Sequence, residues 1–171
     1  MNFVSPVIRL FDRVSEPERV SAHCDIPCGI YDPHAAQIAA LTVLRMDQLI
    51  GNLQSEGTEK AQMDKYGNSL ARYIKVKEEH AEIVKKEIDI LWHDYFRPEH
   101  VEKYPDLHTI IWNANKLASR NKQNVDTAAA EELLGATNRI AEIFWDTKGV
   151  ATRKAGSNQA VGGELVYVNN A

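Results

Sequence analysis

The sequence predicts an all-α fold, an antiparallel four-helix bundle with a short loop before its first helix. Apolar residues recur at three- and four-residue steps in four separate stretches of the chain. Residues that start or stop helices stand at the ends of these stretches. A chain of 171 residues with 44% hydrophobic content suffices for one ordinary core. We therefore expect one globular unit in which neighbouring helices run in opposite directions.

Each helix has its own start or stop signal. Asp32-Pro33 is typical of an N-cap followed by proline at the first helical position, and Pro98 is expected to stop the second helix. Pro105 opens the third helix, Asp126 can cap the fourth, and Gly149 ends it. The apolar positions run, in chain order, from Ala35 to Leu53, from Met63 to Tyr95, from Leu107 to Ala118 and from Leu133 to Phe144.

The two ends of the chain differ from the helical part. Residues 1–22 form a mixed-charge lead without the apolar core of a signal peptide. Residues 150–171 are rich in Gly, Ala and Asn, so we expect a mostly disordered tail in which only Glu164–Val168 resembles a strand. The predicted organisation is a removable propeptide at 1–22, a hook loop plus bundle at 23–149, and the tail.

Composition limits the partners and the compartment. The formal net charge is -4, and basic residues do not cluster with aromatic ones, which argues against nucleic-acid binding. The sequence has no run of about 20 apolar residues, so no membrane span is expected. Only two cysteines occur, which excludes a disulfide framework and favours a reducing compartment. We expect a soluble, cytoplasmic protein.

The densest set of metal-ligand side chains precedes the first helix. His23, Cys24 and Cys28 lie close together, and Pro27 restricts the backbone between the two sulfurs. A cut before His23 would provide its amine nitrogen, the Cys24 peptide nitrogen and two thiolates within one short segment, and four such donors can lie in a plane. Planar nitrogen and sulfur donors suit Ni(II) or Cu(II), whereas zinc prefers a tetrahedral set. The His23 imidazole can then approach from an axial direction.

The segment from His23 to Tyr31 is similar, position by position, to the nickel hook of the nickel superoxide dismutase family. It reads His-Cys-Asp-Ile-Pro-Cys-Gly-Ile-Tyr. The resemblance continues through Asp32-Pro33 and covers roughly residues 23–148. It recurs in three further stretches, Leu91–Pro98, Glu102–His108 and Ile143–Lys148.

This resemblance implies an enzyme that disproportionates superoxide to O2 and H2O2 by Ni(II)/Ni(III) cycling, with one nickel ion per subunit. It implies a precursor that a processing peptidase cuts between Ala22 and His23, and a homohexamer. The implied catalytic set is His23, Cys24, Cys28 and Tyr31, of which the first three bind the metal. Tyr31 and Tyr95 would stand beside the metal without binding it, and Asp25 would brace the hook loop.

Two positions depart from the family pattern. Ala39 and His80 stand where better-known members have a Glu and an Arg that support the axial imidazole. Since both partners of this charge pair are absent together, neither charge is left uncompensated. We expect His80 to replace the pair, although a solvated role on a charged helix is the simpler alternative. Because superoxide is an anion, local cations must attract it, and Lys85 and Arg97 are the candidates.

Two other functions remain open from the sequence. The same hook could serve a nickel-storage or nickel-delivery protein without turnover. Alternatively, Cys24 and Cys28 could form a thiol-redox switch that needs no metal. Superoxide consumption by the trimmed protein separates the enzyme from the first alternative, and loss of activity on metal removal separates it from the second.

Overall fold

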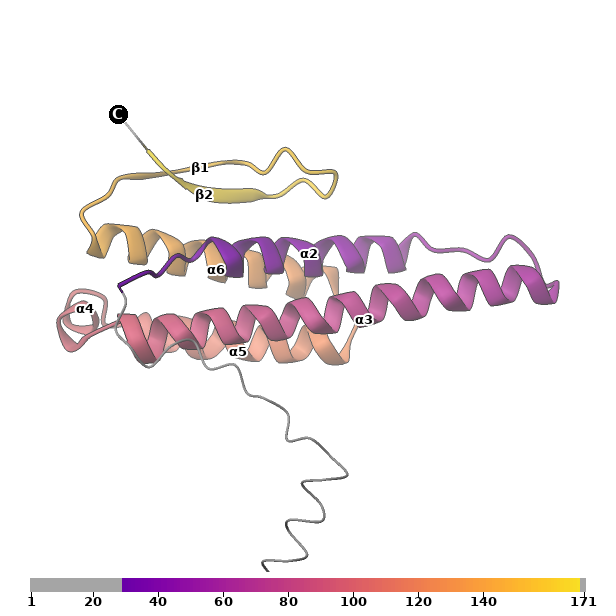
Figure 1. The fold of residues 1–171 in the computed structure, drawn as a ribbon, viewed down its shortest axis with the longest axis horizontal. Helices are drawn as coiled ribbons and strands as arrows, with labels where there is room; N and C mark the ends of the chain where they lie inside the picture. The colour runs from indigo at the N-terminus through magenta and orange to yellow at the C-terminus, as the bar shows by residue number, and fades with distance from the viewer. Residues whose placement is uncertain (1–28, 170–171) are drawn as a thin grey trace, which may run out of the picture.

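The computed structural model describes residues 29–169, and the prediction of a mainly helical chain is confirmed. Helix α2 packs against α3 and α6, and α5 packs against the same two helices. The long helices lie side by side, and successive ones run in opposite directions (Figure 1). The long helices are α2 (His34–Gly51), α3 (Lys60–Ile90), α5 (Leu107–Gln123) and α6 (Thr127–Thr147).

The predicted helix boundaries hold to within a few residues. Asp126 is the N-cap of α6, and its side chain accepts a hydrogen bond from the Ala129 backbone nitrogen at 3.0 Å. Asp32 Oδ1 accepts from the His34 nitrogen at 2.7 Å, and α2 begins at His34, one residue later than expected. Gly149 follows α6 with a φ of 70°, a conformation that glycine adopts without strain.

The end of the second predicted helix is not a simple α-helix. After Ile90 the chain continues as a π-helical turn, η1 (Leu91–Tyr95), closed by a hydrogen bond from the Phe96 nitrogen to the Leu91 carbonyl at 2.9 Å. Pro98 does not terminate this helix directly, because it is the first residue of the short helix α4 (Pro98–Lys103). The wider turn changes the direction in which η1 presents its side chains.

Small and aliphatic side chains, together with Phe144, fill the space between the helices. Val43, Val84 and Phe144 are completely buried. Alanine is frequent in this core and permits close approach of the helices; the buried alanines are Ala36, Ala39, Ala40, Ala81, Ala114, Ala118, Ala129, Ala130 and Ala141. Within residues 29–169, no helix is long and apolar enough to cross a bilayer.

The prediction of a mostly disordered tail is wrong, although the strand-like segment Glu164–Val168 is indeed a strand, and the fold is therefore not purely α-helical. Strands β1 (Thr152–Gly156) and β2 (Glu164–Val168) form an antiparallel hairpin in which Thr152 pairs with Val168. The hairpin lies over α2 and α6 (Figure 1). Leu165 and Val166 are buried, with 2% and 3% of their surfaces exposed.

Buried polar contacts connect this hairpin to the helices. The Gln37 amide nitrogen donates to Asn138 Oδ1 at 2.7 Å, and the Asn138 amide nitrogen donates to the Glu164 carbonyl at 2.8 Å. Since Gln37 and Asn138 are buried, each hydrogen bond satisfies a group that water does not reach. This chain of contacts joins α2, α6 and β2.

Candidate functional site

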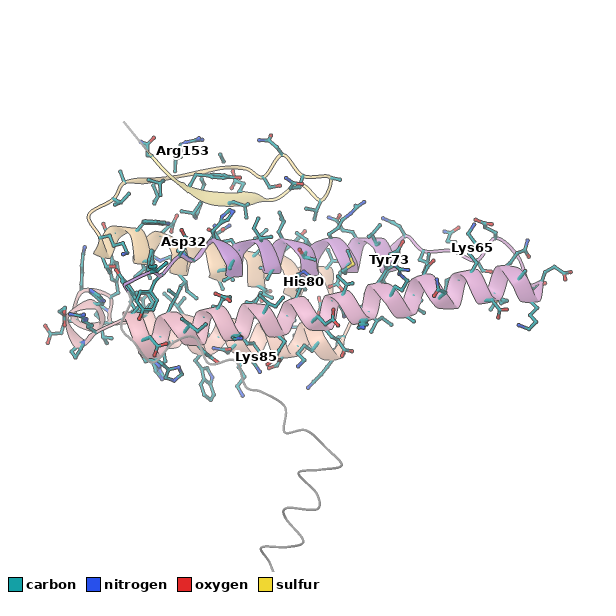
Figure 2. The ribbon with its side chains drawn as sticks, in the orientation of Figure 1. Asp32, Lys65, Tyr73, His80, Lys85 and Arg153 are labelled. Carbon is teal, nitrogen blue, oxygen red and sulfur yellow. The ribbon has the colours of Figure 1, made fainter. Side chains whose placement is uncertain are left out.

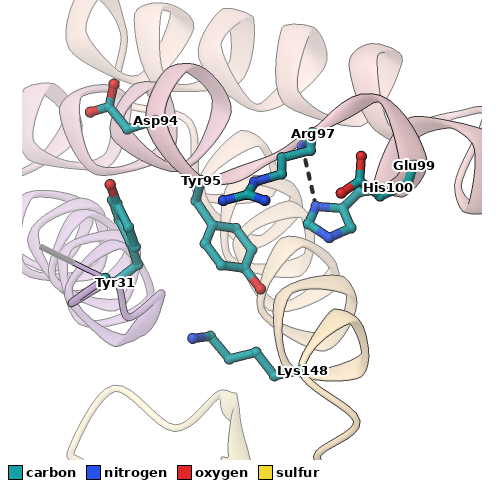
Figure 3. A pocket seen from close by; sticks show the side chains of 8 residues that line it. Tyr31, Asp94, Tyr95, Arg97, Glu99, His100 and Lys148 are labelled. Carbon is teal, nitrogen blue, oxygen red and sulfur yellow. Dashed lines mark hydrogen bonds between the residues drawn. The ribbon is translucent and has the colours of Figure 1, made fainter. Parts of the chain in front are cut away.

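The predicted metal ligands His23, Cys24 and Cys28, together with Asp25, lie outside the described residues, which begin at Gly29. Gly29 lines a cavity of about 330 Å³ at the end of the bundle where α2 starts and α6 ends. The chain therefore enters this cavity directly after Cys28. The other lining residues are Tyr31, Asp94, Tyr95, Arg97, Glu99, His100 and Lys148, and Figure 3 shows their side chains.

Tyr31 and Tyr95 come together in this cavity from distant parts of the sequence. Tyr31 lies in the segment before α2, and Tyr95 ends η1. Their ring centroids are 5.5 Å apart, with the planes inclined at 53°. In Figure 3 the Tyr31 hydroxyl points towards the side of Asp94, whereas the Tyr95 hydroxyl points towards α6. The two rings thus share the cavity, but their hydroxyl groups point in different directions.

The Tyr95 ring is held on several sides. The His100 ring stacks on it at a centroid distance of 5.6 Å, and Phe144 lies at 4.5 Å. The Tyr95 hydroxyl lies 2.7 Å from Thr147 Oγ1. His100 is itself oriented, because its Nδ1 accepts from the Arg97 backbone nitrogen at 3.2 Å (Figure 3). These contacts leave the Tyr95 ring little freedom to turn.

Helix α4, which carries the cavity residues Glu99 and His100, is attached to the end of α6. The Lys103 ammonium forms an ion pair with Asp146, and the Tyr104 hydroxyl donates to the same carboxylate. Hydrogen bonds from Lys103 and Tyr104 lower the pKa of Asp146 below its usual value. This exposed cluster connects the two elements that contribute His100 and Lys148.

Two exposed cations line the cavity. Arg97 precedes α4, and the Lys148 ammonium lies 5.2 Å from the Tyr95 ring centroid and 5.1 Å from that of Phe144. Within the described part of the chain, neither cation has a carboxylate within 4.0 Å, although Asp94 and Glu99 line the same cavity. A small anion entering the cavity therefore meets positive groups that no carboxylate of residues 29–169 neutralises by direct contact.

Sequence reasoning did not single out Lys148 or His100. Lys148 ends the stretch Ile143–Lys148 that carries the family resemblance, so a signal for it existed. Its place at the cavity becomes visible only when the end of α6 lies beside η1. The stacking of His100 on Tyr95 has no sequence signature.

Two other predicted site residues lie away from this cavity, along α3 (Figure 2). His80 donates from Nδ1 to the Val76 carbonyl at 2.8 Å. It precedes Tyr95 by fifteen residues, about 22 Å of helix axis. Lys85 lines a separate cavity between α3 and α5, with its ammonium 3.4 Å from Ser119 Oγ. Arg97 is thus at the cavity, whereas Lys85 and His80 are not.

The candidate nickel ligands all precede the described part of the chain. Among residues 29–169, no group of three or more His, Cys, Asp or Glu side chains is arranged to hold a metal ion. Both thiols of the chain, Cys24 and Cys28, precede the described part. A thiolate-rich planar site suits nickel, and these are the two residues that can supply it.

Comparison with known proteins gives one consistent family. Residues 18–148 match the model of the nickel-containing superoxide dismutases. The chain is 38% identical over 140 residues to the nickel superoxide dismutase of Streptomyces seoulensis, a match that covers 81% of this chain and 98% of the relative. The corresponding Streptomyces coelicolor protein is 38% identical over 130 residues, covering 75% of this chain and 90% of the relative.

Comparison with solved structures gives the same family. A native nickel superoxide dismutase structure superposes with a TM-score of 0.63 and 36% identity, covering 74% of this chain and 99% of that chain. An apo structure gives a TM-score of 0.60 and 32% identity, covering 70% and 98%. The match to the family model ends at Lys148, so the β1–β2 hairpin lies beyond it.

Proposed function

Because the chain belongs to the nickel-containing superoxide dismutase family, we propose that its nickel ion is held by His23, Cys24 and Cys28 at a new N-terminus. The activity is the disproportionation of superoxide to O2 and H2O2, and the cofactor is nickel. When bound, the metal supplies the electron that one superoxide takes up and accepts the electron that another gives up. The His23 amine, the Cys24 peptide nitrogen and both thiolates would be the donors, and the His23 imidazole would be a further one.

One observation supports this placement most strongly. Cys28 is followed directly by Gly29, which lines the cavity that contains Tyr31 and Tyr95. A metal held by the preceding residues would be next to a cavity of about 330 Å³, and a water molecule in the liquid occupies about 30 Å³. The cavity has room for a diatomic anion and ordered water.

The cavity residues have separate proposed roles. Arg97 and Lys148 attract the anion, since both are exposed cations without a carboxylate in direct contact in the described part of the chain. Tyr31 and Tyr95 line the approach, where Tyr31 orders the substrate or water and Tyr95 orders water, and Asp25 braces the hook loop through backbone contacts. Lys85 remains a candidate for longer-range attraction from its separate cavity.

Maturation and assembly follow the same proposal. A peptidase removes residues 1–22 and creates the free amine of His23. The four packed helices support an antiparallel four-helix bundle as the scaffold of the hook. We propose a homohexamer with one nickel per subunit and a cytoplasmic location, without nucleic-acid or membrane partners.

The test is intact mass, nickel content and superoxide consumption of the purified protein. We expect a chain that starts at His23, carries one nickel and consumes superoxide. Cys24→Ser and Cys28→Ser are each expected to lose nickel and activity while circular dichroism still reports helices. Nickel bound without superoxide consumption would favour the storage alternative. Activity that survives metal removal would favour a thiol-redox protein.

We also propose that His80 replaces the family's Glu/Arg pair. His80 lies about 22 Å from Tyr95 along the helix axis. The six residues from His23 to Cys28 span about 20 Å only when fully extended, so they could reach from the cavity to His80 only in a nearly extended conformation. His80→Ala should lower nickel loading or turnover. Unchanged loading and turnover would reduce His80 to a surface residue that bonds its own helix.

A further inference from the structure

Two consecutive hydrogen bonds at the end of α6 determine where the Tyr95 hydroxyl proton points. Tyr95 Oη lies 2.7 Å from Thr147 Oγ1, and Thr147 Oγ1 donates to the Phe144 carbonyl oxygen at 2.6 Å. A carbonyl oxygen only accepts, so this second bond uses the single hydroxyl proton of Thr147. Thr147 Oγ1 must therefore accept in the first bond. Tyr95 is the donor, and its proton points to Thr147.

This direction decides what Tyr95 can offer to the cavity. A tyrosine hydroxyl has one proton, so a proton that points to Thr147 leaves only oxygen lone pairs for other partners. Lone pairs do not stabilise an anion. The ring cannot easily turn to change this, because His100 stacks on it and Phe144 lies at a centroid distance of 4.5 Å. Tyr95 as it stands can accept from water, but it cannot donate to an anionic substrate.

We propose that Thr147 is a positioning residue that keeps the Tyr95 hydroxyl from donating into the cavity. This inference rests on the proposed function for the identity of the anion. The positive groups there are then Arg97 and Lys148, which attract anions without a directional bond from Tyr95. If the Tyr95 hydroxyl donated a hydrogen bond equally to substrate and to other small anions, it would hold them in the cavity without speeding the reaction. Thr147 thus favours rapid exchange of anions at this cavity over tight retention.

Azide binding to the mature, nickel-loaded protein tests whether Thr147 weakens anion binding in the cavity. Thr147→Val has nearly the same shape but no acceptor, so the Tyr95 proton is free to turn towards the cavity. A hydrogen bond to a charged group then lowers the azide dissociation constant about tenfold. Thr147→Ser keeps the hydroxyl and is expected to match the wild type. Tyr95→Phe removes a group that donates nothing to the anion, so azide affinity stays within about twofold of the wild type.

Neutron diffraction from the deuterated full chain without nickel gives a second readout that does not depend on activity. The deuteron on Tyr95 Oη is expected to point to Thr147 Oγ1. A deuteron that points into the cavity would overturn the proposal, as would a tenfold loss of azide affinity in Tyr95→Phe without a gain in Thr147→Val. A mature protein without superoxide turnover would refute the proposed function instead, and the deuteron position would still decide the role of Thr147.

Discussion

The Lys77 ammonium lies 3.5 Å from the Asp47 carboxylate, and 2% and 0% of the two side chains are exposed. Lys77 also donates to the Asn124 carbonyl, and Asp47 accepts from the Asp126 backbone nitrogen at 3.2 Å. This buried ion pair therefore connects α2, α3 and the loop between α5 and α6. Burial raises the pKa of Asp47 above its usual value, although Lys77 opposes the rise. Ionised Asp47 is tolerated in the folded protein because Lys77 is there.

Lys77→Met tests this dependence. Removal of one partner of a buried pair leaves the other charge uncompensated, so we expect a loss of about 3 kcal/mol in the free energy of unfolding near neutral pH. The pKa of Asp47 is already raised, and without Lys77 it rises further. A raised carboxyl pKa gives stability that is present at low pH and lost as pH rises through the folded value.

Urea unfolding at about pH 5 and about pH 8 measures the effect, and the loss in Lys77→Met should be larger at the higher pH. Lys75→Met is the matched control, because Lys75 is exposed on the same helix and pairs with Glu79 at 3.7 Å. It should change stability by less than about 0.5 kcal/mol. A Lys77→Met loss that does not depend on pH would show that Asp47 is not the group left uncompensated.

The hairpin should stabilise the helical part through Leu165. This side chain is 2% exposed, and two residues earlier Gly163 packs so closely that an added Cβ would lie 3.0 Å from Leu134 and 3.1 Å from Leu41. Leu165→Ala is expected to lower the free energy of unfolding by about 3 kcal/mol, a value typical of a buried leucine. Val168→Ala, at a less buried position of β2, should cost about 1 kcal/mol or less. Equal losses at both positions would argue against docking through Leu165.

The sequence predicts the helices well because their signals are local. Apolar spacing and the Asp126 cap depend only on residues a few positions apart, and the structure contains both. The hairpin was missed because β1, with the sequence Thr-Arg-Lys-Ala-Gly, lacks an apolar alternation. Its strand conformation comes from pairing with β2 and from contacts with α6, such as the ion pair of Lys154 with Glu142. The tail glycines that suggested disorder include Gly162 and Gly163, whose positive φ angles permit the turn.

Local sequence signals also predicted part of the candidate site. Tyr31 follows the hook in sequence, so its place at the cavity could be expected. Tyr95 and Arg97 belong to the family-like stretch Leu91–Pro98 and also line the cavity. Lys148 was not singled out, because its approach to Tyr95 requires the end of α6 to lie next to η1. No spacing within either segment specifies that approach.

If Lys148 attracts superoxide, its charge should raise the rate constant for the reaction with superoxide. Lys148→Gln removes a positive charge from the cavity, so the superoxide rate constant should fall about threefold at low ionic strength. The decrease should shrink as salt is added, because salt screens the interaction in both proteins. Pulse radiolysis or stopped-flow kinetics at several salt concentrations measures this.

Lys60→Gln is the matched control for charge, because Lys60 begins α3 at the far end of the helix and is 87% exposed. It should leave the rate constant unchanged. Lys85→Gln tests the separate candidate on α3 in the same series. A rate that does not depend on salt in the unmodified protein would argue against electrostatic attraction as a whole.

Retention of a single residue before His23 should abolish the nickel site. In a chain that starts at Ala22, the His23 nitrogen is part of a peptide bond and no longer a free amine, although both thiols and the imidazole remain. We expect nickel content to fall from one ion per chain to below about 0.1, since a planar site loses one of its four donors. Elemental analysis after equilibration with nickel measures this, and a chain starting at His23 is the control. Because residues 29–169 are unchanged, circular dichroism should be the same for both chains. Full nickel loading of the extended chain would show that the amine is not a ligand, and the coordination proposed for the hook would then be wrong.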